Sequence, residues 1–374
     1  MKIGIVCYPT FGGSGVVATE LGKALAQKGN EIHFITYNMP VRLSDSIPNV
    51  FYHEVSIADY PLFDFKPYEL ALTSKLVDVV KYEKLDLLHV HYAIPHASAA
   101  YMAQHILEDQ GIKIPFVTTL HGTDITLVGK DPSIEPVITF SIKHSDAVTA
   151  VSESLKQDTL KYFEVNRPIE VIPNFVCLDN YPREINKLLK KKYAKKDEKI
   201  VMHISNFRKV KRVNDVVKAF YEINCSIPSQ MIFIGDGPER HNAEMLCRKL
   251  GISENTHFVG KVSAVEQMLS IADIFMLPSE TESFGLAALE AMACGVPVIS
   301  TNTGGLSEVN IHGNTGYLTE VGDIKSLADY SLAILKDDKI LKEFRENALT
   351  QAAAFDVKNI LPAYEKIYNS LLSK

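Results

Sequence analysis

The chain has 374 residues, more than one hydrophobic core usually holds, and therefore predicts two domains of ordinary size. A formal net charge of -6 and a pI near 6.1 disfavour a nucleic-acid partner, which would require a basic surface. Every apolar run is too short to cross a membrane and no signal-peptide pattern is visible, so we expect a cytoplasmic protein without stable membrane association.

Short apolar runs alternate with helix-length segments in both halves of the chain. In the first half, the runs predicted as buried strands are residues 3–7, 32–35, 87–90, 116–119 and 147–150, and a helix is predicted over 16–27. In the second half, strands are predicted at residues 200–204, 231–234, 274–277 and 298–300. Strands that alternate with helices indicate parallel sheets covered on both faces.

The restart of the pattern indicates an α/β protein with two Rossmann-like, doubly wound domains that face each other across a cleft. The predicted boundaries are residues 1–175 for the first domain and 176–355 for the second. A helix over 356–374 is predicted to cross back to the first domain. The lysine-rich join, residues 177–198, is interpreted as a solvated helix face and not as a binding patch. Ligands are expected at the carboxyl ends of the strands.

The loop after the first strand carries a glycine motif with two interpretations. Residues 13–18, Gly-Ser-Gly-Val-Val-Ala, match the dinucleotide fingerprint G-x-G-x-x-A, which favours an NAD-dependent oxidoreductase. That class also needs an acidic residue at the end of the second strand, and residues 35–38 contain none. We therefore disfavour the oxidoreductase and keep the physical meaning of the glycines, which let backbone approach a phosphate closely.

The most informative segment is residues 282–300. Glu282 precedes a predicted helix that begins after Gly285, and Glu290 lies within that helix. Carboxylates accept hydrogen bonds from sugar hydroxyls, and the N–H groups of a first helical turn bind phosphate, so a nucleotide-sugar suits this place. Glu282-Ser-Phe-Gly285, with Glu290 and Gly295-Val-Pro297 after it, resembles the donor-site motif of the family 4 retaining glycosyltransferases of GT-B fold.

This resemblance covers the whole chain and implies a function for each domain. The first domain would bind the acceptor and the second the nucleotide-sugar. In relatives, a loop after the first strand of the second domain carries an arginine and, five residues later, a lysine. Lys211 matches the lysine, but Asn206 stands in the place of the arginine, and Arg208 is our candidate replacement. Residues 235–238 and 258–262 resemble turns that close on a uracil base.

The resemblance implies two sets of site residues. His121 follows a predicted strand, and in the family this histidine contacts the donor sugar. The implied catalytic residues are His121 and Glu282. The implied nucleotide-sugar-binding residues are Gly15, Ser205, Asn206, Arg208, Lys211, Val262, Phe284, Gly285, Leu286 and Glu290.

Other histidines raise the question of a metal. His89 and His91 lie two apart on a predicted strand and so share a face, and His53, His96 and His121 could complete a metal site. No Asp-x-Asp motif is present to hold a metal on a diphosphate, and the five scattered cysteines form no Cys-x-x-Cys pair. We therefore predict a reaction without a metal or another cofactor.

Three segments narrow the resemblance further. Residues 2–15, 89–96 and 204–212 look like those of the family members that transfer N-acetylglucosamine from UDP to the hydroxyl of L-malate, the first step of bacillithiol biosynthesis. The implied partners are the small molecules UDP-GlcNAc and L-malate. Ser14, Tyr92 and Thr119 follow or end predicted strands and are predicted to bind the acceptor.

Several alternatives stay open at the level of sequence. They are a related transferase with a lipid or sugar-phosphate acceptor, a UDP-sugar epimerase and a nucleotide-sugar-binding protein. For the transferase, front-face attack by the acceptor is preferred over double displacement, because no obvious carboxylate nucleophile is present. The sequence leaves open whether the protein forms a homo-oligomer.

Overall fold

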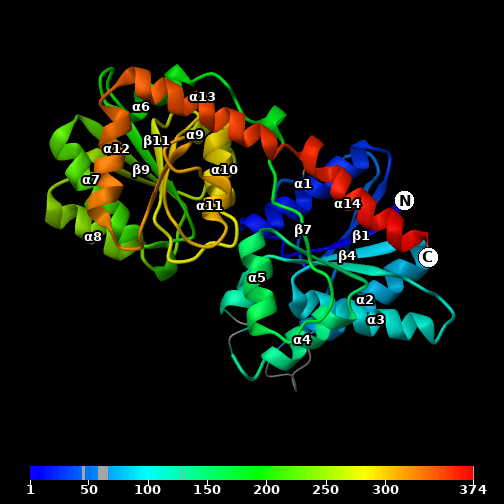
Figure 1. Ribbon diagram of the computed structural model, residues 1–374. Helices are drawn as coiled ribbons and strands as arrows, with labels where there is room; N and C mark the ends of the chain where they lie inside the picture. Colours follow the sequence, from blue (N-terminus) through cyan, green and yellow to red (C-terminus); the bar gives the residue numbers. More distant parts are fainter. Residues whose placement is uncertain (44–46, 58–65, 128, 130, 374) are drawn as a thin grey trace. The chain divides into compact units, whose positions relative to one another are not determined.

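The computed structural model describes residues 1–43, 47–57, 66–127, 129 and 131–373 (Figure 1). It divides the chain into two compact units. Unit 1 comprises Met1–Asn174 and Val357–Lys374, and unit 2 comprises Phe175–Asp356.

Within its described residues, unit 1 contains a seven-stranded sheet in the order β3-β2-β1-β4-β5-β6-β7. The strands are β1 (Lys2–Val6), β2 (Glu31–Thr36), β3 (Val50–Glu54), β4 (Leu87–His91), β5 (Phe116–Leu120), β6 (Ala147–Ala150) and β7 (Glu170–Val171). All adjacent pairs are parallel. The chain moves outward from β1 to β3 and then returns to the other side of β1 with β4, so the strand order reverses between β1 and β4.

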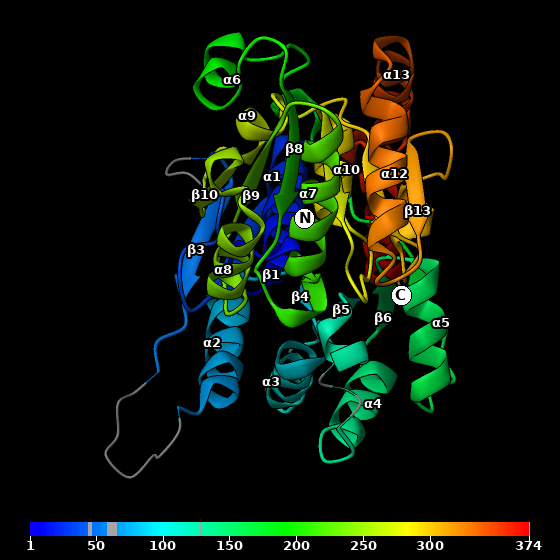
Figure 2. The ribbon, with the colours of Figure 1, turned by 90° about the vertical axis from the view of Figure 1, so that its left-hand side faces the viewer.

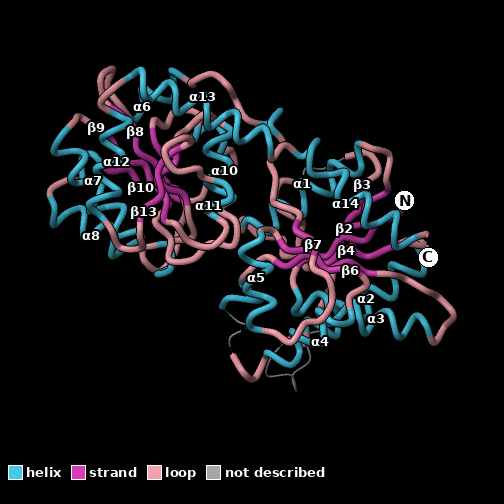
Figure 3. The backbone as a smooth tube through the Cα atoms, in the orientation of Figure 1, coloured by secondary structure: helices cyan, strands magenta, loops and turns pink. Residues whose placement is uncertain are grey.

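Helices cover both faces of this sheet (Figure 3). They are α1 (Gly13–Gln27), α2 (Tyr68–Glu83), α3 (Ser98–Glu108), α4 (Glu135–His144), α5 (Glu153–Tyr162) and α14 (Val357–Leu372). The α2 and α3 helices bury a leucine-, valine- and alanine-rich cluster against Leu88, Val90 and Phe116. Because successive strand residues point to opposite faces, His89 and His91 lie on the other face, where His89 contacts Tyr364 and Tyr368 of α14.

Unit 2 repeats the plan with a six-stranded parallel sheet in the order β10-β9-β8-β11-β12-β13, which reverses between β8 and β11. Its strands are β8 (Lys199–Ile204), β9 (Ser229–Ile234), β10 (Thr256–Gly260), β11 (Ile274–Leu277), β12 (Val298–Thr301) and β13 (Gly316–Thr319). Its helices are α6 (Lys187–Tyr193), α7 (Val213–Ser226), α8 (Arg240–Leu250), α9 (Val265–Leu269), α10 (Leu286–Ala293), α11 (Leu306–Val309), α12 (Ile324–Leu335) and α13 (Asp338–Ala354).

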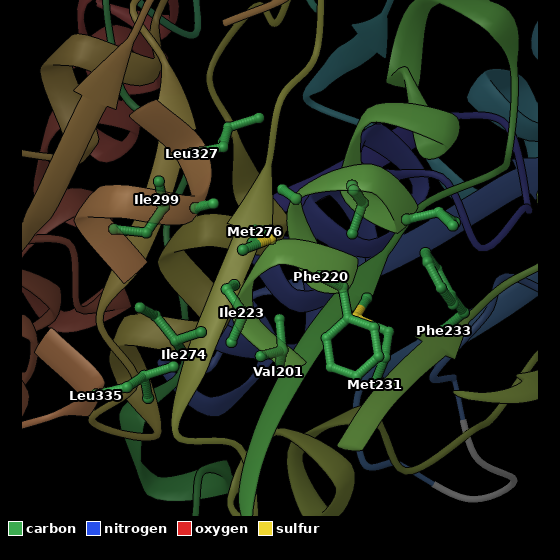
Figure 4. Packing of buried hydrophobic residues seen from close by; sticks show 14 of the residues in the cluster. Val201, Phe220, Ile223, Met231, Phe233, Ile274, Met276, Ile299, Leu327 and Leu335 are labelled. Carbon is green, nitrogen blue, oxygen red and sulfur yellow. The ribbon is translucent and has the colours of Figure 1, made fainter. Parts of the chain in front are cut away.

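The core of unit 2 forms where α7 and α12 pack on the sheet (Figure 4). Phe220 and Ile223 of α7 contribute to one buried cluster with Val201 of β8, Met276 of β11 and Leu327 of α12. Burying a side chain of this size stabilises the fold by ~1.5–3 kcal/mol. The rigid sheet holds the loops at its carboxyl edge, where ligands bind in doubly wound folds.

The prediction of two doubly wound α/β domains is confirmed. Four strands of the described residues were not predicted: β3, β7, β10 and β13. Each residue of β3 is at least partly exposed, so this edge strand shows no continuous apolar run. The α6 helix confirms a lysine-rich helix in the join, although Lys190 is not simply solvated, because it bonds the buried carboxylate of Asp273 at 2.9 Å.

Candidate active site

In unit 1, the glycine loop brings the first turn of α1 to the carboxyl end of β1. Gly12 is the N-cap residue, makes no side-chain cap, and leaves the first N–H groups of α1 without intrahelical acceptors. A Cβ at Gly15 would lie 2.5 Å from the carbonyl oxygen of Tyr8 and 2.6 Å from that of Thr10, so only glycine fits. With no acidic residue in its first turn, the helix start favours an anion such as a carboxylate or a phosphate.

Two of the predicted acceptor-binding residues contact each other at this edge. The Tyr92 hydroxyl donates a hydrogen bond to Ser14 Oγ at 2.8 Å, which links the end of β4 to the start of α1. Tyr92 has φ 89, a left-handed conformation that is costly for a residue with a side chain. Burial raises the pKa of Tyr92 to about 12, so its hydroxyl stays protonated and can donate a hydrogen bond.

The third predicted acceptor residue lies deeper. Thr119 is fully buried on β5, and its hydroxyl lies 2.7 Å from both His89 Nε2 and Thr149 Oγ1. These are the contacts of a core residue, and the acceptor role of Thr119 stays a prediction.

A histidine stack, formed by His89, His91 and His121, lines the same end of the sheet. The rings of His89 and His91 stack with centroids 4.5 Å apart, which confirms that the two share a face. His91 Nδ1 lies 2.8 Å from His121 Nε2, so one of these nitrogens donates a hydrogen bond to the other. Burial lowers the pKa of His121 to about 3, and the ring is therefore neutral at physiological pH.

Asp124 fixes the backbone around His121. Its carboxylate accepts hydrogen bonds from the N–H groups of Ala93 at 2.9 Å and Gly122 at 3.1 Å. Gly122 has φ 108, which permits the tight turn expected after His121. Burial raises the pKa of Asp124 to about 6, despite these backbone donors.

In unit 2, the loop after β8 presents the predicted polar residues at the strand-order reversal. His203 Nδ1 donates to the carbonyl oxygen of Met276 at 2.8 Å, so its Nε2 accepts from the Ser205 hydroxyl at 2.8 Å. Ser205 is thereby oriented from within the sheet. Asn206 and Arg208 are exposed on the same loop.

Lys211 and Glu282 form an ion pair across the reversal between β8 and β11. The Lys211 amine contacts Glu282 Oε1, and the Ser279 hydroxyl donates to the same oxygen at 2.9 Å. The two charged side chains are only 19% and 15% exposed. The predicted phosphate-binding cation and the predicted sugar-binding carboxylate therefore lie together, although 71 residues separate them in the sequence.

A pair of glycines after β12 holds the Glu282 loop, and sequence reasoning missed it. The Gly305 N–H donates to the Glu282 carbonyl at 2.9 Å, and a Cβ at Gly304 would lie 1.9 Å from that oxygen. The Gly-Gly pair four residues after a predicted strand was the available signal. Gly285, with φ 95, then starts α10, whose first turn has no acidic residue and no side-chain cap.

Glu290 lies on α10 and is 8% exposed. The Tyr181 hydroxyl donates to Glu290 Oε1 at 3.0 Å, a contact that the sequence did not indicate. Phe284 is buried and packs edge-on against Phe355, with ring centroids 5.7 Å apart, so its side chain supports the loop. Leu286 is partly exposed at the start of α10.

The two turns predicted to surround a base lie next to each other. The Gly235 N–H donates to the carbonyl oxygen of Gly260 at 2.8 Å, which joins the ends of β9 and β10. A Cβ at Gly235 would lie 1.8 Å from the Ser205 carbonyl oxygen, so this turn packs directly on the Ser205 loop. Val262 is partly exposed just after β10.

Each unit thus offers one chemical environment at the carboxyl edge of its sheet. Unit 2 combines exposed and paired cations, helix N–H groups and carboxylates, which suit a diphosphate and the hydroxyls of sugars. Unit 1 combines helix N–H groups, a protonated tyrosine and a neutral histidine. Among the described residues, His33, His53 and Glu83 form the group that could hold a metal ion. None of these three residues belongs to the histidine stack.

Comparison with solved structures identifies the fold. Sucrose-phosphate synthase from Thermosynechococcus elongatus matches with a TM-score of 0.82 at 22% identity, over 100% of this chain and 99% of that one. Anabaena HepE, solved with UDP and glucose, matches with a TM-score of 0.82 at 19% identity, over 99% of this chain and 100% of that one. The fold is that of the GT-B glycosyltransferases.

Sequence comparisons identify the family. Residues 11–180 match the model of Glycosyltransferase Family 4, and residues 184–351 match that of Glycosyl transferases group 1. The N-acetyl-alpha-D-glucosaminyl L-malate synthase of Bacillus anthracis is 48% identical over 374 residues, which cover 100% of this chain and 97% of that protein. The chain belongs to the family 4 glycosyltransferases. In the described part of the chain, no helix is both long and apolar enough to span a membrane.

Proposed function

We propose that the protein transfers N-acetylglucosamine from UDP-GlcNAc to the hydroxyl of L-malate, with retention of the anomeric configuration, as the first step of bacillithiol biosynthesis in the cytoplasm. One observation carries the choice of substrates: the 48% identity, along the full chain, to the Bacillus anthracis enzyme named for this product. The contacts of unit 2 support the donor half.

On the donor side, Lys211 and Arg208 supply positive charge to the diphosphate, and the first turn of α10 supplies N–H groups. Glu290 accepts hydrogen bonds from the ribose hydroxyls, with Tyr181 fixing one carboxylate oxygen. Gly15, Ser205, Asn206, Val262 and the backbone from Phe284 to Leu286 complete the proposed donor-binding set.

On the acceptor side, malate is a small dianion with one hydroxyl. The N–H groups at the start of α1 suit one carboxylate, and Ser14 and Tyr92 supply hydroxyl donors beside them. His121, held by its contact with His91, contacts the sugar being transferred. Thr119 supports this group from the core.

In the proposed reaction, the bond between the anomeric carbon and the β-phosphate oxygen breaks as UDP leaves. Glu282 stabilises the positive charge that develops on the sugar. The malate hydroxyl forms the new bond from the same face and gives its proton to the departing phosphate. We propose that no divalent metal takes part, because Lys211, Arg208 and the helix N–H groups stabilise the leaving diphosphate.

The test is to incubate the protein with UDP-GlcNAc and L-malate, weigh the product and read its anomeric configuration by NMR. An α-linked N-acetylglucosaminyl malate is expected. Succinate, which lacks the hydroxyl, is the matched control and should give no product. Transfer to a sugar phosphate or lipid acceptor but not to malate would favour a related transferase, and conversion of UDP-GlcNAc without any acceptor would favour an epimerase.

A further inference from the structure

Two histidines and a glutamate come together in unit 1 at the outer strands of the sheet. His33 on β2, His53 on β3 and Glu83 at the end of α2 each place one ligand atom within 4.8 Å of the others. β3 is an edge strand (Figure 2), and α2 packs against β2. The group lies on the outer strands β2 and β3 and at the end of α2, whereas the glycine loop, Tyr92 and His121 follow β1, β4 and β5.

His33 is already oriented as metal-ligating histidines are. Its ring is 1% exposed, and its Nε2 donates to the Glu31 carboxylate at 3.0 Å. Metal-bound histidines commonly donate their second ring nitrogen to a carboxylate in this way, which fixes the tautomer. Lys2 Nζ lies 2.7 Å from the same carboxylate and holds it in place. The proton of His33 is therefore on Nε2, and its Nδ1 carries a lone pair.

The nitrogen of the second histidine faces that lone pair. His53 Nε2 lies 2.9 Å from His33 Nδ1, so the His53 ring carries its proton on Nε2 and donates it. Binding a metal would require only that this proton move to Nδ1 of the same ring, with no net change of charge on either histidine.

From this geometry we propose that His33 Nδ1, His53 Nε2 and the Glu83 carboxylate bind a divalent transition metal ion of the zinc type. Two imidazoles and one carboxylate suit zinc better than magnesium or calcium, which prefer oxygen ligands. Ligand atoms around a tetrahedral zinc lie roughly 3.3–3.6 Å apart, so the three atoms need only small side-chain movements. Water completes the coordination.

The site connects three segments that are far apart in the chain. The bound ion ties the edge strand β3 to β2 and to the end of α2, and its role is to stabilise unit 1 and not to take part in transfer. Because metal that binds only the folded state shifts unfolding by mass action, saturation at about 100 times the Kd should raise the Tm by roughly 5–10 °C.

The experiment is calorimetric titration of the chelator-stripped full chain with ZnCl₂, in a Cys177→Ser/Cys225→Ser background that removes the two cysteines that are not buried. One zinc per chain is expected, together with the rise in Tm. His53→Ala should abolish this site. Glu83→Gln, at a half-buried helix end, should keep the fold and weaken zinc binding tenfold or more.

Matched controls separate this site from general surface binding. His105→Ala removes an exposed histidine that pairs with Glu108, and it should leave the Kd for zinc within twofold. MgCl₂ should bind at least a hundredfold more weakly than ZnCl₂. Absence of a saturable zinc site, or an unchanged Kd in both His53→Ala and Glu83→Gln, would overturn the proposal whether or not the protein makes N-acetylglucosaminyl malate.

Discussion

Replacing Lys211 with alanine tests the donor site most directly. The lysine amine contacts Glu282 at the reversal between β8 and β11, and the side chain is 19% exposed. A charged hydrogen bond of this kind, made to the leaving diphosphate in the transition state, is worth ~1.5–3 kcal/mol. We therefore expect kcat/KM for UDP-GlcNAc to fall about 10- to 150-fold.

The assay is the steady-state release of UDP at saturating malate, with the Tm measured in parallel to show that the variant is folded. Lys209→Ala is the matched control, because Lys209 is exposed in the same short turn. It should keep kcat/KM within twofold. An unchanged kcat/KM in Lys211→Ala, or an equal fall in Lys209→Ala, would refute the assignment of Lys211 to the diphosphate.

A double variant separates two roles for the lysine. If Lys211 acted only by holding the Glu282 carboxylate, then Lys211→Ala/Glu282→Gln would be no slower than Glu282→Gln alone. We expect the double variant to be slower, because the lysine also stabilises the leaving group. Equal rates would reduce Lys211 to a positioning residue.

Glu290→Gln should weaken UDP binding about tenfold or more in calorimetry, since hydrogen bonds to a charged group are worth ~1.5–3 kcal/mol; unchanged affinity would contradict the ribose assignment. At a temperature below the Tm, excess chelator should change the transfer rate by less than twofold. A strict requirement for added magnesium or manganese would count against metal-free transfer. Tyr92→Phe should raise the KM for malate several-fold without changing UDP binding, whereas Thr119→Val should mainly lower the Tm, because its hydroxyl makes two core hydrogen bonds. The free energy of unfolding should fall as the pH drops from about 6.5 toward about 4. Burial lowers the pKa of His89 and of His121 to about 3, so in this range the unfolded chain binds protons that the folded chain does not. Each of the two rings should cost up to about 1.4 kcal/mol of stability per pH unit. The raised pKa of Asp124 opposes one of these losses below about pH 6, and a Tm that stays constant from pH 7 to pH 4.5 would contradict this account.

Much of the fold follows from local sequence patterns. A fully buried parallel strand such as β11 is a continuous apolar run that follows the polar Asp273, and such a run is visible without a structure. The edge strand β3 is not, because its residues face solvent in part and its pairing with β2 comes from the tertiary fold.

The candidate site likewise contains residues that the sequence predicts and contacts that only the tertiary fold creates. Motif position places Lys211 and Glu282 in the loops after two strands and Glu290 within a helix, but their partners come from distant parts of the chain. Tyr181 reaches Glu290 across 109 positions, and no local pattern encodes that contact. For Thr119, the sequence pattern predicts a ligand contact because the residue ends a strand. In the structure, Thr119 is buried and its hydroxyl bonds His89, because side chains of other elements cover it.

The helix α14 makes unit 1 discontinuous in the chain, and this affects how the protein can fold during synthesis. Tyr368 of α14 hydrogen-bonds His89 at 2.7 Å, and Tyr364 packs on the same ring. Those partners leave the ribosome only after unit 2, whose roughly 180 residues take about 10–40 s to translate at ~5–20 residues per second. During that interval, unit 1 lacks the helix that covers His89. Unit 2 can therefore complete its core before unit 1 does, although most of unit 1 is translated earlier.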